Sequence, residues 1–281
     1  MSKNFGVIGF PIGHTMSPFI HKELFKMRGV DADYDKYQIE PENLNTSFND
    51  SLKLLSGINV TIPHRVEIIK LLDELDPIAA EYGAVNTIAI KDGKRIGFNT
   101  DAYGFLKGLE FSGLKLSGKV AVCGFGGAAR TIITESLKAG CEVTVITIES
   151  LMEKAKTVVA ELIEKSGKPI KLIKDTGIAE QYDLLINATP VGMYPNVENS
   201  PIAENQLSHF GSVYDIVYNP TKTKLLKMAT KKGIPSGGGM SMLVCQAELA
   251  HYHWFGSEFS KAEPANLIKA AEEELERTFL K

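Results

Sequence analysis

The 281-residue sequence has few cysteines, no long apolar run and no large excess of charge of one sign. The three cysteines (positions 123, 141 and 245) lack C-x-x-C spacing, so a disulfide framework is not expected. Such a small, odd number of cysteines is typical of a protein of the reducing cytoplasm. No run of about 18 apolar residues occurs, and none of the protein is expected to enter a membrane. The formal net charge of −3 offers no basic field for nucleic acid.

The overall composition and length are typical of a folded globular protein. Hydrophobic residues make up 44% of the sequence, enough for a core. The length predicts about two domains at ~100–200 residues each. The N-terminal stretch has a Gly and a Pro inside its short apolar run, so it resembles a strand and loop more than a signal peptide. The histidines lack close metal-ligand spacing, and no metal site is predicted.

Short apolar strands alternate with amphipathic helical patterns along the chain. A helix is expected from Ser17, as N-cap, to Gly29, with Ile20, Leu24 and Met27 on its apolar face. Asp92-Gly93 predicts a hairpin, and Gly237 to Gly239 is expected to break the chain. Strands are predicted at 5–9, 34–39, 57–61, 119–123, 142–147, 170–173, 183–187 and 212–216. Strands separated by helices imply crossovers and a parallel sheet, hence the α/β class.

A glycine-rich turn follows the predicted strand at 119–123 and precedes a predicted helix. Its G-x-G-x-x-A spacing permits a tight turn at Gly124, close approach of a pyrophosphate at Gly126, and close helix packing at Ala129. The helix N-terminus then offers free N–H groups to phosphate. The turn predicts dinucleotide binding by Gly124, Gly126, Gly127, Ala128, Ala129 and Arg130.

The end of the next predicted strand bears on which dinucleotide binds. Glu149 lies about 25 residues after Gly124, where an acid contacts the ribose 2′-hydroxyl of NAD and would repel the 2′-phosphate of NADP. Lys154 and Lys156 could supply positive charge instead, and Glu149 could simply be a solvated acid at a helix start. The sequence favours NAD and leaves NADP open.

Polar motifs follow several predicted strands of the first hundred residues. Side chains of Ser, Thr and Asn that converge beyond strand ends suit a small polyhydroxylated ligand, and a nearby Arg suits a carboxylate or phosphate. Each motif alone could equally be a cap or a turn. In order, eight motifs resemble the shikimate/quinate dehydrogenase family: GVIGFPIGHTMSPFIH, GINVTIP, GAVNTI, GFNTDAYGF, CGFGGAAR, INATPVGMYP, YDIVYNPTKTKLL and MLVCQAE.

The resemblance implies a substrate domain and a Rossmann domain with the site between them. We assign residues 1–101 plus 242–281 to the first and 102–241 to the second. Such enzymes reversibly oxidise a ring hydroxyl of shikimate or quinate with a nicotinamide cofactor. By motif, Thr15 and Ser17 would hold the substrate carboxylate, and Tyr218 would close the site. Ring hydroxyls would contact Asn59, Thr61, Asn86 and Gln246; the cofactor would also contact Asn187, Thr189 and Gly239.

The sequence departs from the family pattern in three places. Thr15 replaces a serine but keeps the hydroxyl, and Thr147-Ile148-Glu149 replaces the Asn-Arg-Thr usual for NADP. Arg65 stands where the family has a catalytic Lys beside Asp101. Because Arg is effectively always protonated, it is a poor proton shuttle, but it can stabilise an alkoxide. Asp101 or water would then take the proton, and we expect the neighbouring cation to keep Asp101 ionised.

Two alternatives to a shikimate dehydrogenase remain open. The same scaffold could prefer quinate or a modified shikimate. It could also be a dinucleotide- or metabolite-binding protein that has lost catalysis at Arg65. The expected partner is a small cyclic hydroxy acid, not nucleic acid or a membrane, and the expected assembly is a monomer or homodimer.

Overall fold

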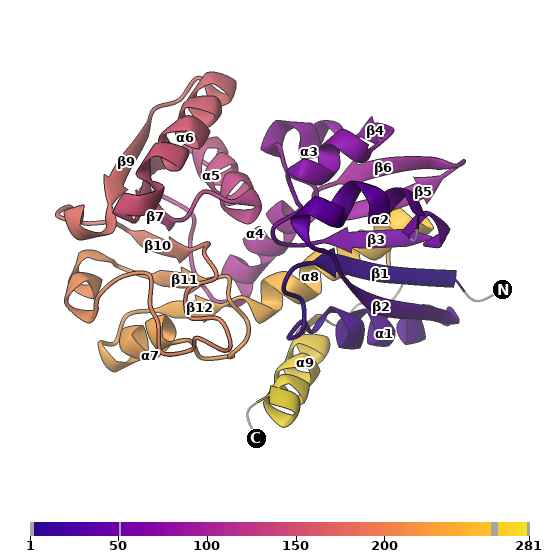
Figure 1. Ribbon diagram of the computed structural model, residues 1–281. Helices are drawn as coiled ribbons and strands as arrows, with labels where there is room; N and C mark the ends of the chain where they lie inside the picture. Colours follow the sequence, from indigo (N-terminus) through magenta and orange to yellow (C-terminus); the bar gives the residue numbers. More distant parts are fainter. Residues whose placement is uncertain (1–2, 51, 260–263, 280–281) are drawn as a thin grey trace.

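A computed structural model describes residues 3–50, 52–259 and 264–279. It contains two six-stranded sheets that lie side by side, with two long helices, α4 (Asp101–Phe111) and α8 (Met240–Phe255), between them (Figure 1). The α/β class predicted from the alternation of strands and helices is confirmed. No helix among the described residues is both long and apolar enough to span a bilayer.

The first sheet is built by the N-terminal third of the chain in the order β2-β1-β3-β5-β6-β4. Its strands are β1 (Lys3–Gly9), β2 (Ala32–Gln38), β3 (Gly57–Val60), β4 (Glu74–Leu75), β5 (Thr87–Lys91) and β6 (Lys94–Phe98). β1 is parallel to β2 and β3, but β5 is antiparallel to both β3 and β6. This sheet is therefore mixed, because the predicted hairpin reverses the chain. Asp92 and Gly93 both adopt positive φ, 51° and 77°, as a tight hairpin turn requires.

Short helices cover the first sheet: α1 (Ser17–Arg28), α2 (Leu44–Asp50), α3 (Pro77–Tyr82) and 3-10 turns at Pro41–Asn43, Leu52–Leu54 and Glu67–Leu71. α1 ends at Gly29 as predicted, but Met16 is its N-cap and Ser17 is its first residue. Ile20 and Leu24 are buried, whereas Met27 is 48% exposed. The prediction of the apolar face of α1 is thus correct at Ile20 and Leu24 but wrong in the last turn, where the Met27 side chain is exposed.

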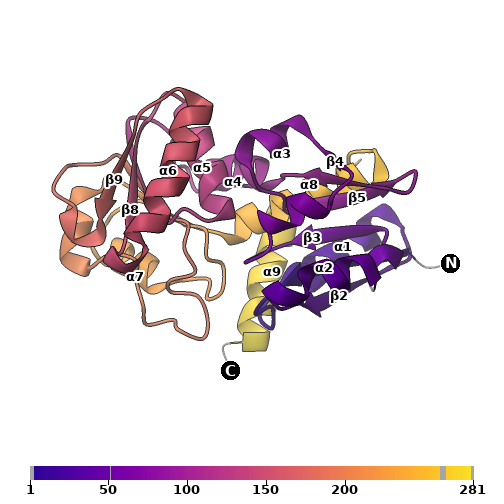
Figure 2. The same ribbon diagram turned by 45° about the horizontal axis from the view of Figure 1, so that its top comes forward.

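The second sheet is wholly parallel, in the order β12-β11-β10-β7-β8-β9. Its strands are β7 (Lys119–Cys123), β8 (Glu142–Thr147), β9 (Ile170–Lys174), β10 (Leu184–Asn187), β11 (Val213–Asp215) and β12 (Ser236–Gly238). Helices α5 (Gly127–Lys138) and α6 (Met152–Ser166) pack on one face and α7 (Lys224–Lys231) on the other (Figure 2). Side chains of β7 point alternately to the two faces of the sheet and are buried on both. Val120 and Val122 belong to the core under α5, and Ala121 and Cys123 belong to the core under α7.

In the glycine run at 237–239, predicted to break the chain, Gly237 and Gly238 form the end of β12 and Gly239 is the N-cap of α8. A Cβ atom on Gly237 would lie 2.1 Å from Ser112 Oγ, and one on Gly239 would lie 2.1 Å from the Ile216 carbonyl oxygen. Since neighbouring segments approach this closely, only glycine fits, and the strand lacks the β-branched residues by which strands are usually recognised.

α4 and α8 connect the two sheets, and α4 was not predicted from the sequence. Close approach of the helices depends on glycine, because a Cβ on Gly104 would lie 2.6 Å from the Met242 carbonyl oxygen. Phe105 and Leu109 of α4 pack into the core of the second sheet beside Tyr214. α9 (Pro264–Phe279) packs against α8 and α1. The predicted domain boundaries stay a prediction, but each sheet has its own core.

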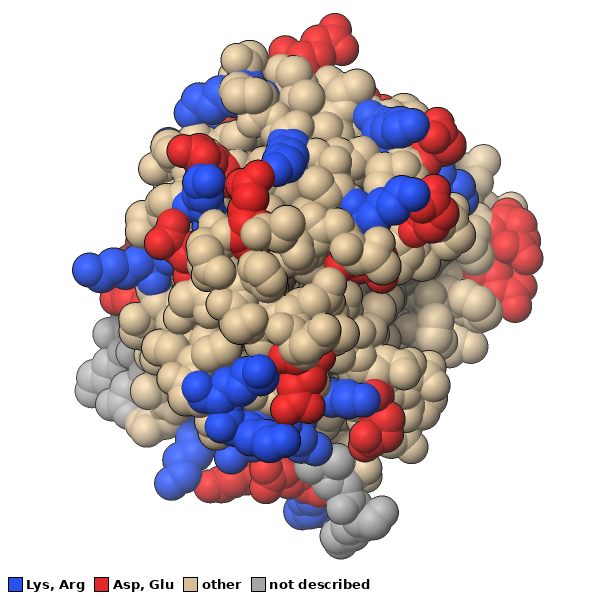
Figure 3. All heavy atoms as spheres, turned by 90° about the vertical axis from the view of Figure 1, so that its left-hand side faces the viewer, with Lys and Arg blue, Asp and Glu red and all other residues tan. Residues whose placement is uncertain are grey.

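Lys and Arg side chains are interspersed with Asp and Glu on the face in Figure 3, which looks onto the second sheet's side of the molecule. Charges of the second sheet also pair with one another, as Lys119 and Lys171 both do with Glu180. This face carries no broad field of one sign.

Candidate active site

A cleft of about 840 Å³ lies between the two sheets. Residues from both halves of the chain line it. All the residues predicted to bind the substrate or to act on it are among them: Thr15, Ser17, Asn59, Thr61, Arg65, Asn86, Asp101, Tyr218 and Gln246. The cleft also brings together six predicted cofactor residues: Gly124, Gly126, Gly127, Ala128, Thr189 and Gly239. A volume of this size suits a small ligand with a cofactor.

Strand direction explains why the polar motifs meet here. Thr61 follows the carboxyl end of β3, and residues 99–101 follow that of β6. β5 runs antiparallel to both neighbours, so its start lies at this same edge, and Asn86 immediately precedes it. The sheet thereby presents amide, hydroxyl and carboxylate groups from three strands at one end.

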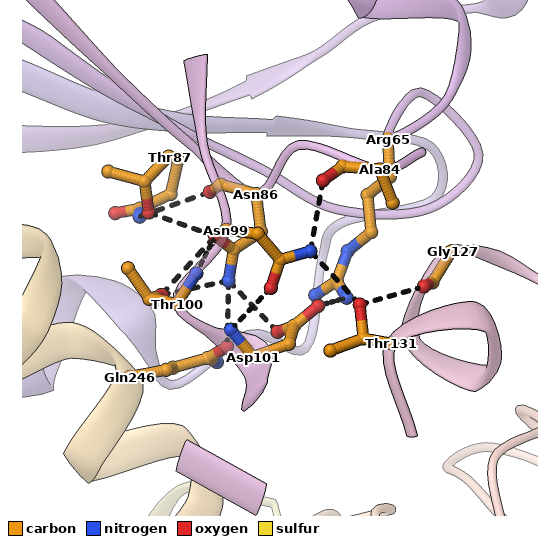
Figure 4. A network of polar contacts seen from close by, with 11 residues as sticks. Arg65, Ala84, Asn86, Thr87, Asn99, Thr100, Asp101, Gly127, Thr131 and Gln246 are labelled. Atoms are coloured by element: carbon orange, nitrogen blue, oxygen red, sulfur yellow. Dashed lines mark hydrogen bonds and ion pairs between the residues drawn. The ribbon is translucent and has the colours of Figure 1, made fainter. Parts of the chain in front are cut away.

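Asp101 and Asn86 form the centre of a buried polar network (Figure 4). Neither Asp101 nor Thr100 is exposed at all, and Asn86 is 3% exposed. Asn86 Nδ2 lies 2.9 Å from Asp101 Oδ1 and 3.1 Å from Gln246 Oε1, while Asn86 Oδ1 accepts from the Thr100 backbone N–H at 2.8 Å. Arg65 Nη1 donates to Asp101 Oδ2. The network holds the carboxylate and the guanidinium in one orientation.

The pKa of the Asp101 carboxyl is raised above its ordinary value, because burial disfavours the charged form. Arg65 and the Asn86 hydrogen bond act in the opposite direction. Burial therefore affects this pKa more than the neighbouring cation does, and the ionised state expected for Asp101 stays a prediction. A carboxyl with a raised pKa exchanges a proton closer to neutral pH than a free one, which suits acid–base work.

A second polar cluster lines the cleft, formed by Thr15, Ser17 and Tyr218. Thr15 Oγ1 donates to Ser17 Oγ at 3.0 Å, and Tyr218 Oη lies 3.5 Å from Thr15 Oγ1. Tyr218 comes from the loop after β11 and Thr15 from the loop after β1, so the cluster joins the two halves of the chain. Three hydroxyls converging on one point can donate to a carboxylate.

The glycine turn has the geometry that phosphate binding requires. Gly124 has φ 103°, and a Cβ there would lie 2.9 Å from Thr189 Cγ2. Nothing lies within 4 Å of a Cβ on Gly126, the residue that precedes α5, so the space above the helix N-terminus is open. A Cβ on Gly127 would lie 2.9 Å from Arg65 Cβ. The residues present thus fit a dinucleotide, and the turn lies directly against Arg65.

Four predicted cofactor residues do not line the cleft. Ala129 is fully buried beneath the turn, and Arg130 Nη2 pairs with Glu161 at 2.8 Å. Asn187 is buried behind Thr189: its Oδ1 accepts from Thr189 Oγ1 at 2.6 Å. Glu149 is solvent-exposed and forms an ion pair with Lys174 of β9. The identity of the residue after β8 could not reveal this ion pair, because Lys174 lies next to Glu149 only once β8 and β9 are paired in the sheet.

Several residues that support the site were missed. Asn99 Nδ2 donates to the Ala84 carbonyl and to Thr131 Oγ1, at 2.9 and 3.0 Å, and so ties the loop before α4 to α5 (Figure 4). Asp215 accepts from Asn187 and Thr223. Their position at or just after a strand end was the available signal, but it does not distinguish a supporting residue from one that lines the cleft. No group of three or more His, Cys, Asp or Glu in the described ranges could hold a metal ion.

Comparison with known proteins agrees with this geometry. Residues 7–88 match the family described as the shikimate dehydrogenase substrate binding domain. The chain is 40% identical over 261 residues to a Bacillus cytotoxicus protein named shikimate dehydrogenase (NADP(+)), covering 91% of this chain and 94% of that one.

Solved structures are similar over almost the full length. A shikimate dehydrogenase crystallised with NADP+ superposes with a TM-score of 0.87 at 36% identity, covering 98% of this chain and 96% of that one. A Listeria monocytogenes shikimate 5-dehydrogenase, solved with shikimate and NAD, has a TM-score of 0.79 at 29% identity, with coverage of 98% and 96%. The chain belongs to the shikimate dehydrogenase family.

Proposed function

We propose that this protein reversibly oxidises a ring hydroxyl of shikimate, or of a close relative, to the ketone, with a nicotinamide dinucleotide as hydride acceptor. The observation that carries the proposal is the position of the Arg65–Asp101 pair. It touches the glycine turn at Gly127 on one side and the Asn86 amide on the other, and Asn86 is bonded in turn to Gln246. A hydroxyl held by those amides would face both the pair and the cofactor side of the cleft.

The pair supplies the proton chemistry. In the oxidative direction Asp101, in its ionised form, accepts the proton of the reacting hydroxyl. The Arg65 guanidinium stays protonated and stabilises the negative charge that develops on that oxygen. The nicotinamide ring, when bound, accepts the hydride. In the reductive direction protonated Asp101 returns the proton to the oxygen, a role that its raised pKa favours.

The remaining polar residues hold the substrate. Thr15, Ser17 and Tyr218 donate hydroxyl hydrogen bonds to its carboxylate, since their hydroxyls already converge. Ring hydroxyls need both donors and acceptors, which amides and hydroxyls supply. These come from four residues that line the same cleft: Asn59, Thr61, Asn86 and Gln246.

We further propose that NAD is preferred to NADP. Among the described residues that line the cleft, Arg65 is the only Lys or Arg, and it is committed to Asp101. Ile148, in the place of the family's usual Arg, lines the cofactor end and offers no charge to a 2′-phosphate. Lys174 is neutralised by Glu149. The NADP(+) in the Bacillus relative's name describes that protein and points the other way, so the preference rests on this chain's own residues.

Initial rates of reduced-cofactor formation test these proposals, with shikimate and quinate each combined with NAD and NADP. We expect the highest kcat/KM with shikimate and NAD. Faster turnover of quinate would identify a paralogue with another substrate. Binding of shikimate and NAD without turnover in any combination would refute the proposed dehydrogenase activity and identify a binding protein. The presence of Arg65 where the family has a catalytic Lys would then explain the lost activity.

A further inference from the structure

Tyr34, a buried residue of β2, lies directly behind the substrate end of the cleft. It is 9% exposed and is not among the residues that line the cleft. Its hydroxyl nevertheless donates a hydrogen bond of 2.7 Å to Oδ1 of Asn59, which does line the cleft. Tyr34 therefore contacts a residue proposed to bind the substrate without being exposed to the substrate itself.

The amide of Asn59 is held at three points. Its Nδ2 lies 3.1 Å from Thr87 Oγ1 and 3.3 Å from the Asn86 carbonyl oxygen, so both N–H donors are used within the protein. Its Oδ1 has two lone pairs, of which Tyr34 occupies one. The group that Asn59 can still offer to a ligand is the second lone pair of Oδ1, an acceptor for a hydroxyl hydrogen.

Tyr34 is itself rigidly placed. Its ring stacks on the His21 imidazole with centroids 4.2 Å apart and planes 7° from parallel. His21 Nδ1 in turn lies 3.0 Å from His251 Nε2 of α8, and both rings are buried. Burial lowers the pKa of His21 to about 3 and that of His251 further still, so both rings are neutral. Burial also raises the pKa of the Tyr34 phenol well above its ordinary value, so it remains a donor.

We propose that Tyr34 is a positioning residue for substrate recognition, whose hydroxyl orients the Asn59 amide so that Oδ1 accepts from a ring hydroxyl of the substrate. This inference rests on the proposed function. Without the Tyr34 hydroxyl, Oδ1 loses the shortest of the hydrogen bonds that hold the amide, and the orientation of the amide then depends on the two longer bonds of Nδ2 alone. A turned amide would present N–H groups where an acceptor is needed.

The expected consequence is a loss of substrate affinity. Tyr34→Phe should raise the Kd and KM for shikimate about tenfold, as loss of about one hydrogen bond would. The kcat should change less than about twofold, because the contact with Asn59 is made equally before and during the reaction. The KM for the dinucleotide should not change, because Tyr34 lies at the other end of the cleft.

A double-mutant cycle separates this role from a structural one. Shikimate Kd is measured by calorimetry, and KM and kcat by initial rates, for the wild type, Tyr34→Phe, Asn59→Ala and the double variant. If Tyr34 acts through Asn59, the tenfold loss falls below about twofold in the Asn59→Ala background. Asn59→Ser serves as the second background if Asn59→Ala does not fold. Tyr37→Phe is the matched control, because Tyr37 is on the same strand and its hydroxyl makes no hydrogen bond within the described ranges.

Three results would overturn the inference. An equal loss in both backgrounds would show that Tyr34 acts elsewhere, for instance through its neighbour Ser17. Unchanged affinity in Tyr34→Phe would exclude any role in recognition, even if the melting temperature falls. A similar loss in Tyr37→Phe would indicate a general effect on β2. Failure of the proposed function is distinguished by the wild type, which would then not turn over shikimate at all.

Discussion

Replacing Asp101 with Asn removes the proposed proton acceptor while keeping the shape of the side chain. Asn retains an oxygen for the hydrogen bond with Asn86, and the backbone N–H of residue 101 still donates to Asn99 Oδ1. What disappears is the negative charge opposite Arg65. Because general acid–base catalysis contributes typically ~10²–10⁴-fold, we expect kcat for shikimate oxidation to fall by that factor.

The same substitution leaves a buried guanidinium without its counter-ion. The Arg65 side chain is 13% exposed, and its Nε already lacks a hydrogen-bond partner among the described residues. Breaking a buried ion pair costs about 3–5 kcal/mol. We expect Asp101→Asn to lower the free energy of unfolding by about 3 kcal/mol, the lower end of this range, because the hydrogen bond with Asn86 remains. Urea denaturation followed by circular dichroism measures this change.

The pH dependence of kcat provides the decisive assay. In the wild type, oxidation requires the Asp101 carboxylate, so kcat should fall as the pH drops through its pKa, which burial has raised. The Asp101→Asn variant should lose this acidic limb along with the rate. If the variant keeps kcat within tenfold and shows the same acidic limb, Asp101 is not the proton acceptor and another group or water fills that role.

Three further predictions concern the pair, the cofactor and stability. Arg65→Lys should raise kcat, up to ~10²-fold, because Lys can exchange a proton; an unchanged or lower kcat would show that Arg65 does not limit the reaction. Ile148→Arg should raise kcat/KM for NADP relative to NAD at least about tenfold, as a charged hydrogen bond to phosphate would, and an unchanged ratio would mean that the 2′-position lies elsewhere. Burial raises the pKa of Asp215 from 3.8 to about 6, so the folded state binds its proton more tightly than the unfolded chain. Its contribution to stability is present below pH 4 and is lost as the pH rises through 6, by about 3 kcal/mol at 1.36 kcal/mol per unit. Asp215→Asn should lack this slope in urea denaturation between pH 4 and 7, and the same slope in both proteins would assign it to other groups.

Local patterns in the sequence carried much of the fold. β7 and β8 lie at the predicted residues, because a run of apolar residues between turn signals is itself the property that makes a buried strand. The order of eight polar motifs indicated the family, and all nine substrate and catalytic candidates meet in one cleft. Most of them meet because their motifs lie next to strand ends, and strands of a sheet end at a common edge, whereas Gln246 comes from within α8.

Contacts between distant segments decided the rest. β12 has glycine at position 237 because Ser112 leaves no room there for a side chain, and Gly239 follows the strand where the Ile216 carbonyl approaches, which the residues of this segment do not themselves reveal. Glu149 is turned toward Lys174 by the pairing of β8 with β9. The direction of the Asp101 pKa shift depends on how far burial outweighs Arg65, and burial exists only once α4 packs between the sheets. Sequence patterns record which residues prefer which local structure, whereas charge state, close approach and pairing depend on the neighbours that folding brings within a few ångströms.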